Sequence, residues 1–66
     1  MTSEEIRAAV DAGWKLQFLP IDNSWRLKRP GHEMQPINKQ VPELMRERGL
    51  IERRENSAHW QVWGFV

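Results

Sequence analysis

The chain has 66 residues, a formal net charge of +1 and no cysteine. A chain of this length forms one domain, which we place over residues 1–66, and it buries only about 60% of its unfolded surface. The composition excludes disulfide bonds and thiolate metal sites, and no run approaches the roughly 20 apolar residues of a membrane span. Four tryptophans and two phenylalanines are therefore expected to supply much of the core.

The chain opens with a helix signal. Thr2 is placed to cap the backbone, and Glu5, three positions later, is placed to reach back, which is the capping-box pattern. Ile6 and Val10 then share one helical face. Gly13 follows where a left-handed residue would end the helix. We therefore expect an N-terminal helix that ends near Gly13.

Two alternating segments then predict a β-hairpin. Trp14, Leu16 and Phe18 alternate with polar residues, which is the period of a strand with one buried face. Residues 20–24 supply turn formers, and residues 25–28 alternate again. An antiparallel strand pair is expected here.

A second helix is expected from about Pro42 to Arg48, where apolar residues recur at helical spacing. Proline is tolerated at the first helical position, whereas inside a helix it costs roughly 3 kcal/mol. We therefore start the helix at Pro42 and expect a turn or a short helical piece over Pro36 to Gln40. Gly49 should end the helix.

Residues 50–55 and 58–65 predict a second hairpin around a short polar turn. In the returning strand, Trp60 and Trp63 fall on opposite faces. One of them is expected to pack on the helices. The other is either covered by the first hairpin or left for a partner.

The order helix, β-hairpin, helix, β-hairpin predicts a small α+β domain in which helices cover one sheet face. The segment Arg48 to Arg54 ends a leucine-bearing helix and enters a short hairpin. This segment resembles the recognition helix and wing of winged-helix DNA-binding proteins, a helix-turn-helix variant. The resemblance spans about Ile37 to Val62 and implies a small winged-helix-like domain of bacterial or phage type. It departs from the family at Pro42 and in having a hairpin where a helix usually precedes.

The resemblance implies a small regulatory protein that binds double-stranded DNA with a short helix and a C-terminal wing. Arginine suits both tasks because its guanidinium binds guanine edges or phosphate oxygens in bidentate fashion. Bases outnumber acids from Trp25 onward. A homodimer on a two-fold site would extend the contact. The implied nucleic-acid-binding residues are Lys39, Gln40, Arg46, Arg53 and Arg54.

Other interpretations stay open. Glu43 and Glu47 lie on the same helix as Arg46, and carboxylates repel phosphate, so these charges are equally explained as solvated surface residues. A protein-binding module, an adaptor or inhibitor, would use exposed tryptophan and arginine as a hot spot. Exposed tryptophans beside Arg26, Lys28 or Arg29 would alternatively stack on single-stranded bases. The candidate residues for such partner contacts are Trp25, Arg26, Lys28, Trp60 and Trp63.

Enzymatic function finds little support in the pattern. His32 and His59 are the only histidines, and they lie far apart in the sequence without metal-ligand spacing. The four glycines form no phosphate-binding loop. We expect no catalytic residue, metal or cofactor. The first residues lack the pattern of a signal peptide, so a cytoplasmic protein is expected.

Overall fold

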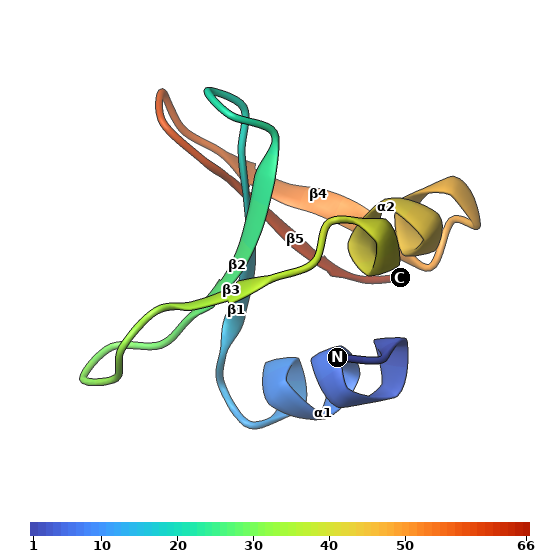
Figure 1. Ribbon diagram of the computed structural model, residues 1–66, viewed down its shortest axis with the longest axis horizontal. Helices are drawn as coiled ribbons and strands as arrows, with labels where there is room; N and C mark the ends of the chain where they lie inside the picture. The colour runs from blue at the N-terminus through green and yellow to red at the C-terminus, as the bar shows by residue number, and fades with distance from the viewer.

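The computed structural model describes all 66 residues and has two helices on one side of a five-stranded antiparallel sheet (Figure 1). The strand order is β3-β2-β1-β5-β4. The predicted α+β class is confirmed. In chain order the elements are α1 (Ser3–Asp11), β1 (Lys15–Leu19), β2 (Ser24–Lys28), β3 (Gln35–Ile37), α2 (Gln40–Glu47), β4 (Ile51–Asn56) and β5 (Gln61–Phe65).

The predicted winged-helix architecture is wrong. The meander β1-β2-β3 separates α1 from α2, so no helix-turn-helix pair forms. The expected wing, hairpin β4–β5, is part of the central sheet because β5 pairs with β1 through partners such as Leu16 and Trp63. Alternating hydrophobicity identifies strands without saying which strands pair, so a hairpin inside a sheet has the same pattern as a projecting wing.

Strand β3 replaces the turn or short helical piece that was expected to begin at Pro36. Pro36 pairs with Arg26 in this edge strand, the position where a sheet tolerates proline. Helix α2 then begins at Gln40, before the expected Pro42, and Asn38 Oδ1 accepts a hydrogen bond from the Gln40 N–H at 2.9 Å. Pro42 therefore lies inside the first turn, where backbone N–H groups have no intrahelical partner.

The predicted cap at the start of α1 and the predicted glycines after both helices are confirmed. The Thr2 N–H donates to Glu5 Oε1 at 3.0 Å, and the Glu5 N–H donates to the Thr2 hydroxyl at 3.2 Å, which completes the capping box of α1. Gly13 and Gly49 follow the two helices with φ of +106° and +70°, a conformation that side chains disfavour. Neither helix is long and apolar enough to cross a membrane.

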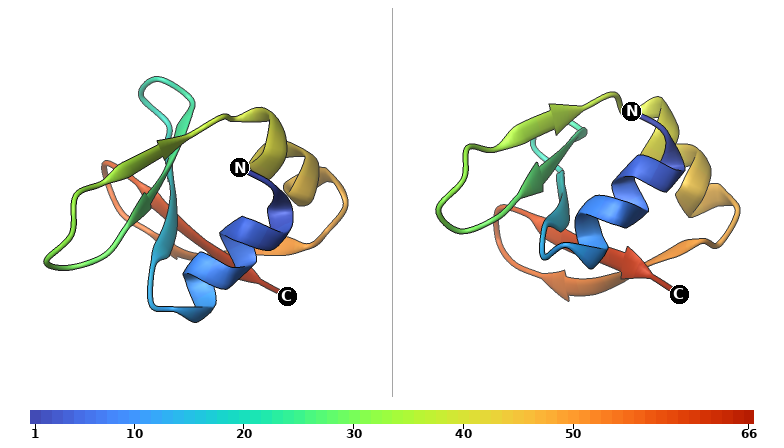
Figure 2. Two further views of the ribbon diagram at one scale, coloured as in Figure 1. Left: turned by 60° about the horizontal axis from the view of Figure 1, so that its bottom comes forward. Right: turned by 90° about the horizontal axis from the view of Figure 1, so that it is seen from below.

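The core lies between the helices and the sheet. Its centre is formed by two cross-strand pairs, Leu16 with Leu27 and Phe18 with Trp25. Both views of Figure 2 place α1 beside α2 on this side of the sheet, so the opposite side carries no helix. The remaining buried members of the core are Ile6 from α1, Met45 from α2 and Ile51 from β4.

Candidate nucleic-acid interface

The sheet side that carries no helix is called the helix-free face. Side chains alternate along a strand, so the neighbours of the core residues point to this face. Val62 of β5 joins them because it pairs with Gln17. The residues that β1 and β2 place on the helix-free face are Lys15, Gln17, Leu19, Ser24, Arg26 and Lys28.

Two lysines stand directly opposite each other at one end of the helix-free face. Lys15 of β1 is the cross-strand partner of Lys28 of β2, and the next pair on this face is Gln17 with Arg26. Like charges that face each other across two strands destabilise a sheet. The fold thus gathers three cations at some expense of stability, and an anionic ligand would relieve their repulsion.

Arg26 is held in place by its neighbours. Its Nε donates to Gln17 Oε1 at 2.7 Å, and its Nη1 lies 2.9 Å from the Met34 sulfur. Gln17 is itself buried, with only 5% of its surface exposed. The Arg26 guanidinium is therefore positioned before any ligand arrives, which lowers the entropy lost on binding.

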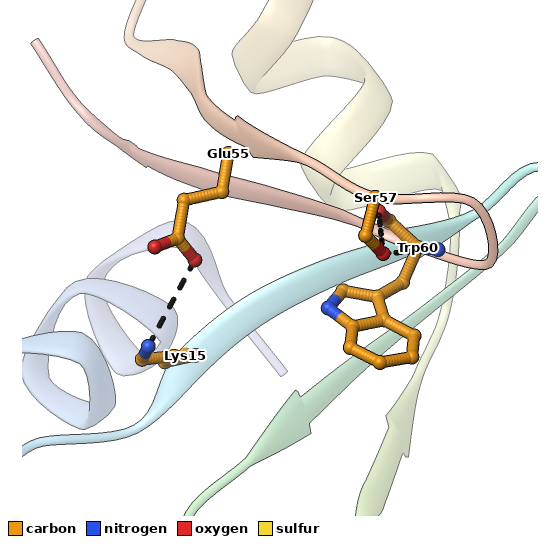
Figure 3. A network of polar contacts seen from close by, with 4 residues as sticks. All are labelled: Lys15, Glu55, Ser57 and Trp60. Atoms are coloured by element: carbon orange, nitrogen blue, oxygen red, sulfur yellow. Dashed lines mark hydrogen bonds and ion pairs between the residues drawn. The ribbon is translucent and has the colours of Figure 1, made fainter.

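A hollow of about 300 Å³ lies at this end of the face, lined by Lys15, Gln17, Lys28 and Pro30. Lys15 makes a long 3.9 Å ion pair with Glu55 (Figure 3), in which both side chains are more than half exposed, so the pair contributes little. Lys28 forms no ion pair. Both ammonium groups are therefore available for charge-assisted hydrogen bonds to phosphate oxygens.

Trp60 lies at the other end of the helix-free face. The Ser57 N–H and hydroxyl donate to the Trp60 carbonyl at 2.9 and 3.1 Å and close the β4–β5 turn. The indole points from this turn toward β1 (Figure 3), and 38% of the residue is exposed. Extended by one residue beyond the Phe18–Gln61 pair, the register of β5 with β1 puts Trp60 level with Leu19, about 13 Å along β1 from Lys15.

Arg54 of strand β4 already makes polar contacts within the chain. Arg54 Nη2 donates to the Phe65 carbonyl at 2.7 Å, and Nη1 lies 3.0 Å from Glu52 Oε1. A Cβ built on Gly64 would come within 3.0 Å of Arg54 Nε. The glycine therefore lets the arginine side chain lie across β5, and Arg54 is less available to a ligand than Lys28.

Two of the arginines predicted to bind DNA, Arg46 and Arg53, do not lie on the helix-free face. The Arg46 guanidinium carbon lies 5.8 Å from each of the ring centroids of Phe18, Trp25 and Trp63, on the helix-bearing side. Arg53 is the cross-strand partner of Trp63 and faces the same side. Arg46 therefore covers an aromatic cluster on the helix-bearing side, where it remains exposed.

The other predicted residues fall into three places. Lys39 and Gln40 are exposed at the start of α2. Trp25 is 1% exposed and belongs to the core, and Trp63 is half-buried with its Nε1 donating to Gln61 Oε1 at 3.3 Å. The structure brings the remaining partner-binding candidates together on the helix-free face: Arg26, Lys28 and Trp60.

Lys15 and Gln17 are absent from the residues predicted to bind a partner. Their signal is the alternation in β1, which places both on the polar side of a half-buried strand. That pattern shows the exposed side of the strand but not the residue across from it. Only the register reveals that Lys15 faces Lys28.

Comparisons with protein-family models, with curated proteins and with solved structures found no match.

Proposed function

We propose that this protein binds single-stranded nucleic acid across its helix-free face. The observation that carries the proposal is the pair Lys15 and Lys28 at one hollow, with Arg26 in the next cross-strand pair, on a sheet face that also presents Trp60. The cations would bind backbone phosphates, and a base a short distance along the nucleic-acid strand would stack on the Trp60 indole. A cationic track beside an aromatic platform is the usual means of binding single strands with little sequence preference.

A duplex fits this arrangement less well. The exposed residues of α2 include Leu44 and Glu47, and Arg46 is turned toward the aromatic cluster. Besides Gln40 at its start and Arg46, the exposed residues of α2 are Leu44 and Glu47, which carry no donor for a guanine edge or a phosphate in a major groove. In a single strand the bases are free to turn toward Trp60, whereas in a duplex they are stacked inside.

The proposal predicts a modest dependence on salt. Three cations that each neutralise one phosphate of a single strand would give a log-log slope of about −2, at roughly −0.7 per phosphate. A fluorescence anisotropy titration with a labelled oligothymidylate, at several salt concentrations, measures this slope. The same titration with oligouridylate and with a DNA duplex tests which form of nucleic acid is preferred.

Matched variants locate the contact. Trp60→Ala should weaken binding by about tenfold because it removes one stacked base. The double variant Lys15→Gln with Lys28→Gln should also reduce the steepness of the salt dependence. Lys39→Gln is the control for the loss of a single lysine charge, because it removes one from an exposed position outside the helix-free face.

The outcomes separate clearly. Absence of binding at low salt would refute the proposal, as would an equal loss of affinity in the Lys39→Gln control. Tighter binding to the duplex than to either single strand would refute the preference for single strands. Circular dichroism of each variant checks that the fold is retained.

A further inference from the structure

The hollow beside Lys15 and Lys28 lies where the helix-free face ends. Lys15 is the first residue of β1 and Lys28 is the last of β2, so no further pair of these two strands follows them. The chain turns after Lys28, and Pro30 of that turn lines the hollow together with the two lysines. A nucleic-acid strand that runs along this face from Trp60 therefore arrives at the end of the sheet when it reaches the hollow.

Both lysines can reach a single anion in this hollow. Residues directly opposite each other on antiparallel strands have Cβ atoms about 4.5–5.5 Å apart. Each lysine carries its ammonium group on a flexible stem of four carbons, so the two groups can approach one anion from opposite sides. The only carboxylate paired with either lysine is that of Glu55, at 3.9 Å from Lys15 Nζ. The hollow of about 300 Å³ leaves room for a phosphate group.

Gln17 adds a buried amide donor to the hollow that it helps to line. Its Oε1 accepts a hydrogen bond from Arg26 Nε at 2.7 Å, which identifies the oxygen end of the amide. The Nε2 group makes no hydrogen bond within the chain, although only 5% of the residue is exposed. Buried polar groups are normally paired. The amide N–H groups are therefore free to donate to an oxygen of a bound anion.

The donors of the hollow match a terminal phosphate better than an internal one. An internal phosphate of a nucleic-acid strand carries one negative charge. A phosphate monoester carries about −1.5 to −2 at pH 7 and presents three strong acceptor oxygens. Two ammonium groups and one amide supply the corresponding charge and donors. On a strand that ends in hydroxyls, the same lysines would meet internal phosphates, each with a single charge.

We propose that the hollow binds the phosphate monoester at the end of a single strand. Lys15 and Lys28 pair with its charge, and the Gln17 amide donates to one of its oxygens. The inference rests on the proposed function, because Arg26 and Trp60 would hold the nucleotides that follow the terminal phosphate. The protein would accordingly prefer strands with a phosphorylated end over strands of the same sequence that end in hydroxyls.

Competition titrations test this end preference. Unlabelled oligothymidylates of one length displace a fluorescent oligothymidylate, and they carry a phosphate at the 5′ end, a phosphate at the 3′ end, or hydroxyls at both ends. One phosphorylated competitor should bind about tenfold more tightly than the hydroxyl form, because the monoester gains charge-assisted hydrogen bonds. The competitor that gains identifies the end of the strand that lies in the hollow. Converting its terminal phosphate to a methyl ester, which carries a single charge, should remove most of the gain.

Variants of the protein assign the preference to the hollow. Lys15→Gln and Lys28→Gln should each bring the affinities for phosphorylated and hydroxyl ends close together. Trp60→Ala is the matched control, because it should weaken all competitors by the same factor and leave their ratio unchanged. Lys39→Gln should also leave the ratio unchanged, since Lys39 is exposed outside the helix-free face. Circular dichroism confirms that each variant is folded.

The results distinguish this inference from the proposed function. If oligothymidylate binds but both phosphorylated forms bind no more tightly than the hydroxyl form, the end preference is overturned and the proposed function stands. An undiminished preference in Lys15→Gln and Lys28→Gln would also overturn it, since the end would then be bound elsewhere. If no oligonucleotide binds, both the proposed function and the end preference are refuted.

Discussion

Lys15 and Lys28 face each other across β1 and β2. The repulsion between their ammonium groups is offset only by the carboxylate of Glu55, which forms a long ion pair with Lys15. Residues in an unfavourable pairing are candidates for function, because the pairing does not stabilise the fold. The next pair on the same face, Gln17 with Arg26, forms a hydrogen bond. The unfavourable pairing is therefore confined to Lys15 and Lys28.

Lys28→Gln should therefore stabilise the fold while weakening nucleic-acid binding. Removing the like-charge contact should raise the free energy of unfolding by about 0.2–0.5 kcal/mol, and less at high salt. Urea unfolding at low and high salt measures this change. Lys39→Gln, which removes a charge without a facing lysine, should leave stability nearly unchanged. A clear loss of stability in Lys28→Gln would show that Lys28 supports the sheet.

Arg46 illustrates what a residue type does not reveal. An arginine on a short helix before a hairpin is equally suited to bind DNA or to cover aromatic rings. In the structure its guanidinium lies over Phe18, Trp25 and Trp63, where a cation interacts favourably with each ring. These rings come from three different strands, so no local sequence pattern predicts that they lie together.

At the scale of elements, the start of α1 makes stability depend on pH. The backbone N–H of Thr2, and then its side chain, hydrogen-bond Glu5 and lower the pKa of that carboxyl below its ordinary value of 4.5. A carboxyl with a lowered pKa in the folded state stabilises the fold above its unfolded pKa. That contribution is lost as the pH falls through the folded pKa.

Glu5→Gln should accordingly remove part of the loss of stability on acidification below pH 4.5. Thr2→Ala should lower stability at neutral pH by about 1 kcal/mol, since it removes the N-cap. Thermal unfolding followed across acidic pH measures both effects. If Glu5→Gln and the parent chain lose stability in parallel as the pH falls, the capping box does not account for the acid sensitivity.

Helix α2 shows how far element boundaries follow from sequence. The glycine that ends it, Gly49, was predictable because a left-handed residue is needed after the last turn. Its start was placed too late, since Pro42 is compatible with several positions of the first turn and Asn38 provides the hydrogen bond to Gln40. Strand β3 was missed because three residues containing a proline carry almost no strand signal.

At the scale of the whole molecule, the sheet limits its own growth. The edge strand β3 is short and contains Pro36, and the edge strand β4 is rich in charged residues. Both features discourage pairing with further strands. The sheet is therefore not expected to grow by pairing with a further strand.

The margin of stability is a property of the whole molecule, and Leu16→Ala should remove most of it. Leu16 is fully buried, and such truncations cost about 2–5 kcal/mol. A domain of this size is stable by roughly 3–10 kcal/mol. Chemical denaturation and the dispersion of amide resonances measure the effect. Ile21→Ala, at a 90% exposed residue, should change little; an equally small change in Leu16→Ala would place the core elsewhere.

The sequence by itself determined the α+β class, the capping box of α1, the glycines that end both helices and the polar side of β1. Each of these depends on residues only a few positions apart. The tertiary structure alone decided that β5 joins β1, that β3 completes the sheet, that Lys15 faces Lys28 and that Arg46 covers three aromatic rings. These contacts join distant segments, and they are selected by the burial of one common core, which no local pattern describes.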